Sequence, residues 1–210
     1  MSLDPQQKLL KAEEYKAEGN ERFKEKLYKK ALVSYAKGIA YVKNLPGSSR
    51  NIPDGMGQLA AMRPTTVALD TDVDQKSLQL EVILHSNIAI CHIKLGTFHR
   101  NIPRYCCILF LLYNSLNRPP WSFIGDGAKC VEAATKALVL NPTALKALLR
   151  KCEGYILLNN CEKANEFLEE AKKHADESAQ IPINDLRKRI IKMEKDQVLK
   201  QKEMFSKIFL

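Results

Sequence analysis

Two pairs of polar residues at helical spacing are the candidates for chemistry in this sequence. Lys16 and Asn20 are four residues apart, as are Lys146 and Arg150, so each pair shares one face of a helix. Ammonium and guanidinium groups hold carboxylates through charge-assisted hydrogen bonds, and asparagine amides donate further bonds without adding charge. Together they suit an acidic ligand. Taken singly, each pair is also typical of a solvated helix face, and Asn20 suits a bond to the adjacent backbone or a neighbouring helix.

The elements that must position these residues repeat along the chain. Between Ala12 and Val42, large and small residues alternate in a fixed order, with Tyr15 before Gly19 and Tyr35 after Ala31. Small residues let two helices approach closely while aromatic residues fill the space around them. We predict one domain with repeat 1 at about 12–45, a loop at 46–74, repeat 2 at about 78–142 interrupted by an insert at 101–126, repeat 3 at about 143–176, and a capping helix at about 184–210.

This order of Tyr, Gly, Tyr, Ala and Tyr resembles the 34-residue tetratricopeptide motif, a pair of antiparallel helices. The resemblance implies an all-α fold, a tetratricopeptide-repeat superhelix of three antiparallel helix pairs plus a C-terminal capping helix. A helical array needs such a cap to cover its last apolar face. The concave face would be lined by the first helix of each repeat.

Across the three repeats, the pattern of Lys16 and Asn20, then Asn87, then Lys146 and Arg150 is similar to the dicarboxylate clamp of chaperone-binding tetratricopeptide domains. Asn87 is taken to occupy the place in the second repeat that Asn20 occupies in the first. The resemblance implies a co-chaperone-like adaptor that binds the C-terminal Glu-Glu-Val-Asp of heat-shock protein 90 or 70. The alternative is a scaffold that binds an internal peptide or helix in the concave groove, without chaperone dependence.

Three further features resemble the tetratricopeptide repeat protein 9 family and the repeat domains of large immunophilins. They are the dipeptide Gly19-Asn20, the long loop before the second repeat and the closing KEMFSKIF. Immunophilins carry a peptidyl-prolyl isomerase domain ahead of their repeats. This chain begins only about a dozen residues before its first repeat, so the resemblance implies no isomerase activity here.

The segment 101–126 is unlike its surroundings. It holds the single tryptophan of the chain, two adjacent cysteines and Pro119-Pro120, and an exposed apolar loop of this kind favours aggregation. Deleting it would leave a helix, a turn of ordinary length and a second helix. We hypothesise that the insert is foreign to the fold, as a retained intron or gene-model artefact would be; the alternative is a genuine insertion packed on the outer surface.

The C-terminal segment from Leu186 to Leu210 is basic and amphipathic. A capping helix with its charged face in water is the first interpretation, and a calmodulin-target or membrane-surface helix is the alternative. The net charge of +9 favours acidic partners. No arginine-rich tract with interleaved aromatic residues is present, which argues against nucleic acid. No stable membrane insertion is expected, since the apolar run from Cys106 to Tyr113 is too short to span a bilayer.

Catalytic and metal-binding interpretations find little support. His85, His92 and His99 are seven residues apart, about 10.5 Å along a helix axis, which is too far to share one ion. The six cysteines lack CxxC pairing and indicate reduced thiols in a cytoplasmic protein. There is no glycine-rich phosphate loop and no GxSxG motif. We therefore expect no enzyme activity and no cofactor.

Overall fold

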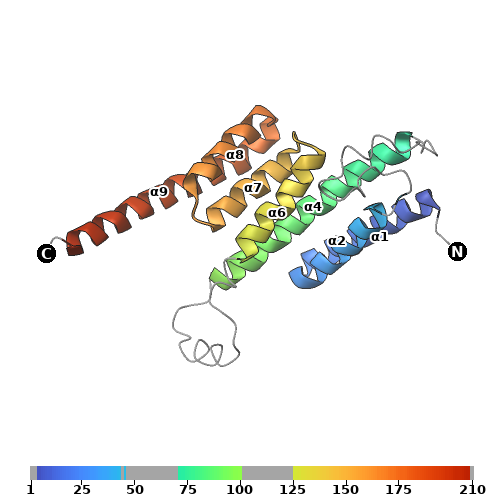
Figure 1. Ribbon diagram of the computed structural model, residues 1–210, viewed down its shortest axis with the longest axis horizontal. Coiled ribbons are helices and arrows are strands. Elements are labelled where there is room, and N and C mark those ends of the chain that lie inside the picture. Colours follow the sequence, from blue (N-terminus) through green and yellow to red (C-terminus); the bar gives the residue numbers. More distant parts are fainter. Residues whose placement is uncertain (1–3, 44, 46–70, 101–124, 209–210) are drawn as a thin grey trace, which may run out of the picture.

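The computed structural model describes residues 4–43, 45, 71–100 and 125–208, and every element within these ranges is helical. The elements are α1 (Pro5–Lys24), α2 (Tyr28–Lys43), α4 (Thr71–Arg100), α6 (Gly125–Leu140), α7 (Leu145–Leu157), α8 (Cys161–Lys173), the short 3-10 helix η3 (Glu177–Ala179) and α9 (Gln180–Ile208). Antiparallel helix pairs stack side by side, and α9 closes the C-terminal end (Figure 1). The predicted all-α fold of three helix pairs and a capping helix is confirmed.

The first pair, α1 and α2, packs closely at a glycine. Gly19 is buried, and a Cβ atom built on it would lie 2.4 Å from the aromatic ring of Tyr35 in α2. A larger residue would force the ring away, so glycine is needed for this approach. Lys26 adopts a left-handed φ of 62° between the helices, which lets the chain reverse direction. Gly19 and Tyr35 thus fix how α2 lies against α1.

Helix α4 joins the first pair to the rest of the array. Its residues Leu80 and Leu84 belong to a buried cluster with Ala12 of α1 and Tyr35 of α2. A second buried cluster, on its C-terminal half, joins Ala89 and Ile93 of α4 to Cys130, Ala133 and Ala134 of α6. Because both clusters include α4, this helix sets the position of the first repeat relative to those that follow.

The third pair and α9 share one core. Leu148 and Cys152 of α7, Leu168 of α8, and Ile183 and Ile190 of α9 are buried together. The turn between α7 and α8 uses Asn159 at a left-handed φ of 58°. The next residue, Asn160, caps α8 by accepting a hydrogen bond from the backbone N–H of Lys163 at 3.0 Å.

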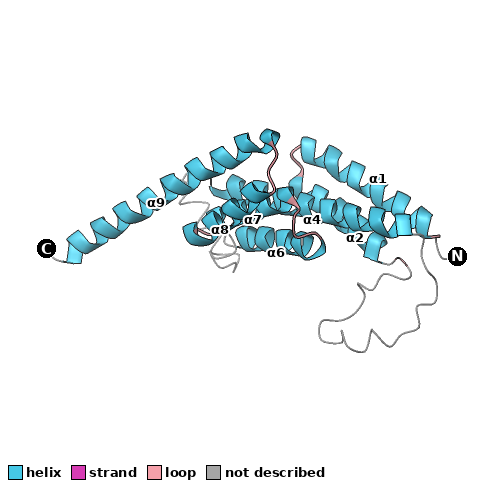
Figure 2. Cartoon of the chain, turned by 90° about the horizontal axis from the view of Figure 1, so that it is seen from above, coloured by secondary structure: helices cyan, strands magenta, loops and turns pink. Residues whose placement is uncertain are grey.

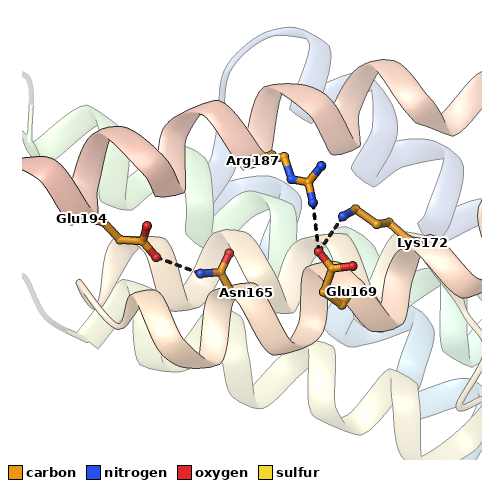
Figure 3. Close-up of polar contacts among 5 residues, drawn as sticks. All are labelled: Asn165, Glu169, Lys172, Arg187 and Glu194. Atoms are coloured by element: carbon orange, nitrogen blue, oxygen red, sulfur yellow. Dashed lines mark hydrogen bonds and ion pairs between the residues drawn. The ribbon is translucent and has the colours of Figure 1, made fainter.

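Polar contacts fix α9 on α8 (Figure 3). Asn165 donates to Glu194 at 2.8 Å, and Arg187 forms an ion pair with Glu169 at 3.3 Å. Beyond Gln197, the side chains of Val198, Leu199, Met204 and Phe205 are exposed, and this distal part extends past the other helices (Figure 2). The proximal part of α9, up to Gln197, is therefore the capping helix, whereas in the distal part the side chains at 198–206 are all exposed.

Several predicted boundaries were wrong. Helix α4 begins at Thr71 rather than near Leu78, because buried Val73 and Ser77 extend its packed face by two turns. Because Ser77 is polar, the sequence does not show the apolar periodicity of this packed face. The Ser77 hydroxyl donates to the backbone oxygen of Asp74 at 2.8 Å. Helix α4 also continues past Gly96 to Arg100, and α6 begins at Gly125, inside the proposed insert.

Helix α9 begins at Gln180 rather than Asn184, because Pro182 falls in its first turn, where a missing N–H breaks no helical bond. Most of the predicted loop at 46–74 and of the predicted insert at 101–126, namely residues 46–70 and 101–124, lies outside the described residues.

Candidate functional site

Two of the predicted site residues, Asn20 of α1 and Asn87 of α4, lie in contact. The Asn87 side chain donates from Nδ2 to Asn20 Oδ1 at 3.4 Å. The same oxygen accepts a hydrogen bond from the Tyr35 hydroxyl of α2 at 2.9 Å. Three helices thus converge on one amide oxygen, and this settles which way the Asn20 amide faces. Its NH₂ group has no partner among the described residues, and the side chain is exposed to solvent.

This arrangement follows from the packing of the first pair. The close approach at Gly19 places the Tyr35 ring directly across from α1, one residue before Asn20. Tyr35 is only 2% exposed, and burial raises the pKa of its phenol to about 12. The hydroxyl therefore stays protonated and keeps donating. The sequence analysis did not assign Tyr35 to the site, because its partner is on another helix.

The two lysines of the predicted site are available for a ligand. Lys16 is half-buried on the face of α1 that carries Asn20, and Lys146 is exposed on the face of α7 that carries Arg150. Neither ammonium group has an ion pair or hydrogen bond within the described part of the chain. No contact among the described residues joins either lysine to the two asparagines.

Arg150 differs from the lysines, because it is already paired. Its Nη1 lies 2.8 Å from Glu153 Oε2, one turn farther along α7. The other carboxylate oxygen, Oε1, forms an ion pair at 3.6 Å with Nη1 of Arg189 in α9. Sequence reasoning missed both residues. The spacing of Arg150 and Glu153, at i and i+3, was a readable signal. Arg189 had none, since its place beside α7 depends on how α9 docks.

The register of the three first helices corrects one prediction. Each carries a buried small residue in its C-terminal half: Gly19 in α1, Ala89 in α4 and Cys152 in α7. Asn87 and Arg150 both stand two residues before it, whereas Asn20 stands one residue after. Asn87 therefore does not match Asn20 along its helix. The position of Asn20 is matched on α7 by Glu153.

Among the remaining candidates for chemistry, His85, Cys91, Cys130 and Cys152 lie in the described part of the chain and are buried. His85 lies 3.7 Å from Glu81, one turn away on α4, with both side chains buried. Burial raises the pKa of the Cys91, Cys130 and Cys152 thiols to about 12, so they are poor nucleophiles. Within the described residues, no group of three or more histidine, cysteine or acidic residues is placed to hold a metal ion. That the chain is not an enzyme stays a prediction.

The proximal half of the C-terminal helix α9 agrees with the interpretation of this segment as a capping helix. Leu186 and Ile190 are buried in the core, and Met193 packs against it. Val198, Met204 and Phe205 are exposed. Among the helices that the structure describes, none is long and apolar enough to cross a membrane.

No family model and no curated protein matches the sequence. Among solved structures, the Hsp90 co-chaperone Cns1 from Saccharomyces cerevisiae matches with a TM-score of 0.60 at 19% identity, over 99% of this chain and 46% of that one. This chain thus spans less than half the length of Cns1. The C-terminal TPR-containing domain of a putative FK506-binding protein from Plasmodium falciparum matches with a TM-score of 0.58 at 18% identity, over 96% of this chain and 97% of the domain. The fold of this chain is that of a tetratricopeptide-repeat (TPR) domain.

Proposed function

We propose that this chain is a protein-interaction adaptor of the co-chaperone type, which binds the acidic C-terminal peptide of heat-shock protein 90 or 70. The peptide would be held by Lys16, Asn20, Asn87, Lys146 and Arg150 acting as a dicarboxylate clamp. The observation that carries the proposal is the contact between Asn20 and Asn87, which joins the first two repeats at one point. The likeness to an Hsp90 co-chaperone supports it.

The chemistry of the exposed groups suits a chain end with two carboxylates. Tyr35 and Asn87 both donate to the Asn20 carbonyl oxygen, and the NH₂ group, which has no partner among the described residues, can donate to a ligand. Lys16 and Lys146, which form no ion pair with any residue that the structure describes, carry positive charge on the first and third of the helices that would line the binding face. A C-terminal aspartate carries a main-chain and a side-chain carboxylate, and charge-assisted bonds to both would distinguish it from an internal aspartate.

A calorimetric titration tests the proposal. The ligand is a peptide ending in Met-Glu-Glu-Val-Asp, and its twin has a C-terminal amide. We expect micromolar binding of the free acid and a loss of at least about tenfold on amidation, since one charged group is removed from a charge-assisted contact. Lys146→Ala should weaken binding of the free acid to a similar extent. Arg150→Ala should do the same.

Lys136→Ala is the matched control. Lys136 is an exposed lysine on α6, the second helix of its repeat, and within the described ranges it pairs only with Glu132 on its own helix. The variant changes the net charge as Lys146→Ala does but should leave the affinity unchanged. Equal losses in the two variants would indicate general attraction by the basic chain rather than a clamp.

The second candidate is a scaffold that binds an internal segment. It predicts that the amidated peptide binds as well as the free acid, and that the lysine variants behave alike. Salt dependence gives an independent criterion, because dissolved ions weaken the attraction between exposed charges, with a Debye length of about 8 Å at physiological ionic strength. A clamp made of such pairs should weaken several-fold between low and physiological salt.

A further inference from the structure

Glu153 is shared by two arginines that come from different helices. Each of its carboxylate oxygens faces one guanidinium: Oε2 faces Arg150 of α7 at 2.8 Å, and Oε1 faces Arg189 of α9 at 3.6 Å. The Glu153 side chain is only 16% exposed, whereas those of Arg150 and Arg189 are 32% and 38% exposed. The acid therefore lies beneath the two bases, and both bases reach solvent.

Helix α9 continues the row of first helices. Helix α1 packs against α4, α4 against α7, and α7 against α9, so α9 stands where the first helix of a fourth repeat would stand. Figure 2 shows α1 and α9 along the same side of the array. Glu153 matches Asn20 in register, and Asn20 belongs to the proposed site. A side chain of α9 that meets Glu153 therefore borders that site from its C-terminal end.

The charges explain why a second arginine is needed. A carboxylate at this position would repel an acidic peptide and would also occupy Arg150. With Arg189 present, the three groups together carry a net charge of +1. Each arginine uses few of its five N–H donors in its contact with Glu153. Both guanidiniums keep donors for another anion. Without Arg189, the pair of Arg150 and Glu153 would be neutral.

We propose that Arg189 is a sixth anion-binding residue of the clamp, held beside Arg150 by Glu153, and that it contacts a carboxylate of the bound acidic peptide. The inference rests on the proposed function of the site. It gives α9 a part in ligand binding besides capping the core. Glu153 acts through the arginines and is a positioning residue.

Arg187 offers a matched control on the same helix. It lies two residues before Arg189, is exposed, and also pairs with a glutamate, Glu169 of α8 (Figure 3). Arg187→Ala and Arg189→Ala therefore remove the same charge and one ion pair each. In titrations of the full chain with the free-acid peptide at low salt, Arg189→Ala should weaken binding about fivefold, as expected for one partly exposed ion pair. Arg187→Ala should stay within about twofold of the parent chain.

Arg189→Lys keeps the charge but not the planar fork, so its affinity should lie between those of the parent chain and Arg189→Ala. Equal affinities for Arg189→Ala and Arg187→Ala, with the parent chain binding normally, would overturn the inference and leave the proposed function standing.

The pairing itself has a readout without peptide. The Nε–Hε resonance of Arg150 in the free chain should move in Glu153→Gln and in Arg189→Ala, but not in Arg187→Ala. If the Arg150 resonance does not move in Arg189→Ala, Glu153 is not shared by the two arginines. If the parent chain binds no peptide at all, the proposed function fails and Arg189 loses its ligand, whatever the resonance shows about the pairing.

Discussion

The hydroxyl of Tyr35 donates a hydrogen bond to Asn20 Oδ1 at 2.9 Å, and this bond joins the second helix of the first repeat to the proposed binding residue on the first helix. A buried aromatic residue thereby controls which end of the exposed Asn20 amide faces away from the helices. The same residue, Tyr35, packs against Gly19 between the two helices of the first pair and orients the Asn20 amide of the proposed site.

Tyr35→Phe should weaken binding of the free-acid peptide several-fold, because the Asn20 amide loses the bond that fixes its orientation. The free energy of unfolding should fall by about 1 kcal/mol, the usual net worth of one hydrogen bond. Calorimetry and urea unfolding measure the two effects. Tyr28→Phe is the control, since its ring packs edge-on against Phe23 and its hydroxyl has no hydrogen-bond partner among the described residues. An affinity unchanged by Tyr35→Phe would show that Asn20 needs no such support.

Gly19→Ala should destabilise the chain by about 1–3 kcal/mol, the cost of overpacking, even though alanine is the better helix former. The new methyl group would lie 2.4 Å from the Tyr35 ring, which is buried in the core of the first helix pair. Gly38→Ala is the comparison. Its Cβ would lie 3.1 Å from a methyl group of Leu84, so we expect a smaller loss or a gain. The urea unfolding midpoints of the two variants test this prediction. A stabilising effect of Gly19→Ala would contradict the close approach of α1 and Tyr35.

The two halves of α9 should differ in their contribution to stability. Ile190→Ala should cost about 2–5 kcal/mol, because Ile190 is 1% exposed in the core shared with α7 and α8. Leu199→Ala, at a residue 58% exposed on the same helix, should change the free energy of unfolding by less than about 0.5 kcal/mol. Thermal or urea unfolding of both variants provides the test, and equal losses would mean that the distal half is packed in solution.

Alkaline pH should destabilise the fold. Burial raises the pKa of the thiols of Cys91, Cys130 and Cys152 from 9.0 to about 12 in the folded chain. Between these values the unfolded chain has lost protons that the folded chain keeps, so stability falls as the pH rises through this window. Below about pH 9 these thiols should contribute no pH dependence. Urea unfolding between pH 7.5 and 10.5 measures the slope.

Cys130→Ala provides the control for this prediction. Removing one of the three buried thiols should make the alkaline slope shallower, whatever the variant costs in stability at neutral pH. An unchanged slope would assign the alkaline loss to other groups, of which the buried phenol of Tyr35 is the first to consider, since its pKa is also raised to about 12.

The helices and their order were predictable from the sequence, because they depend on local spacing. Gly19 and Tyr35 signalled a closely packed pair, and Lys146 and Arg150 share a helix face by their spacing alone. Where the apolar periodicity was weak, the helices begin at residues other than those predicted. A buried Ser77 concealed the first turns of α4, and Pro182, which lies in the first turn of α9, fell just before the predicted start of that helix at about residue 184.

What the tertiary structure decided is which side chains meet across helices. The bond from Asn87 to Asn20 joins residues far apart in the sequence, and the bond from Tyr35 gives Asn20 its orientation. The sharing of Glu153 by Arg150 and Arg189 exists only once α9 has docked on α7 and α8. Helical periodicity specifies the face on which a residue lies. The partner on the opposing helix depends on the packing of small and large side chains between the helices, and no local pattern records it.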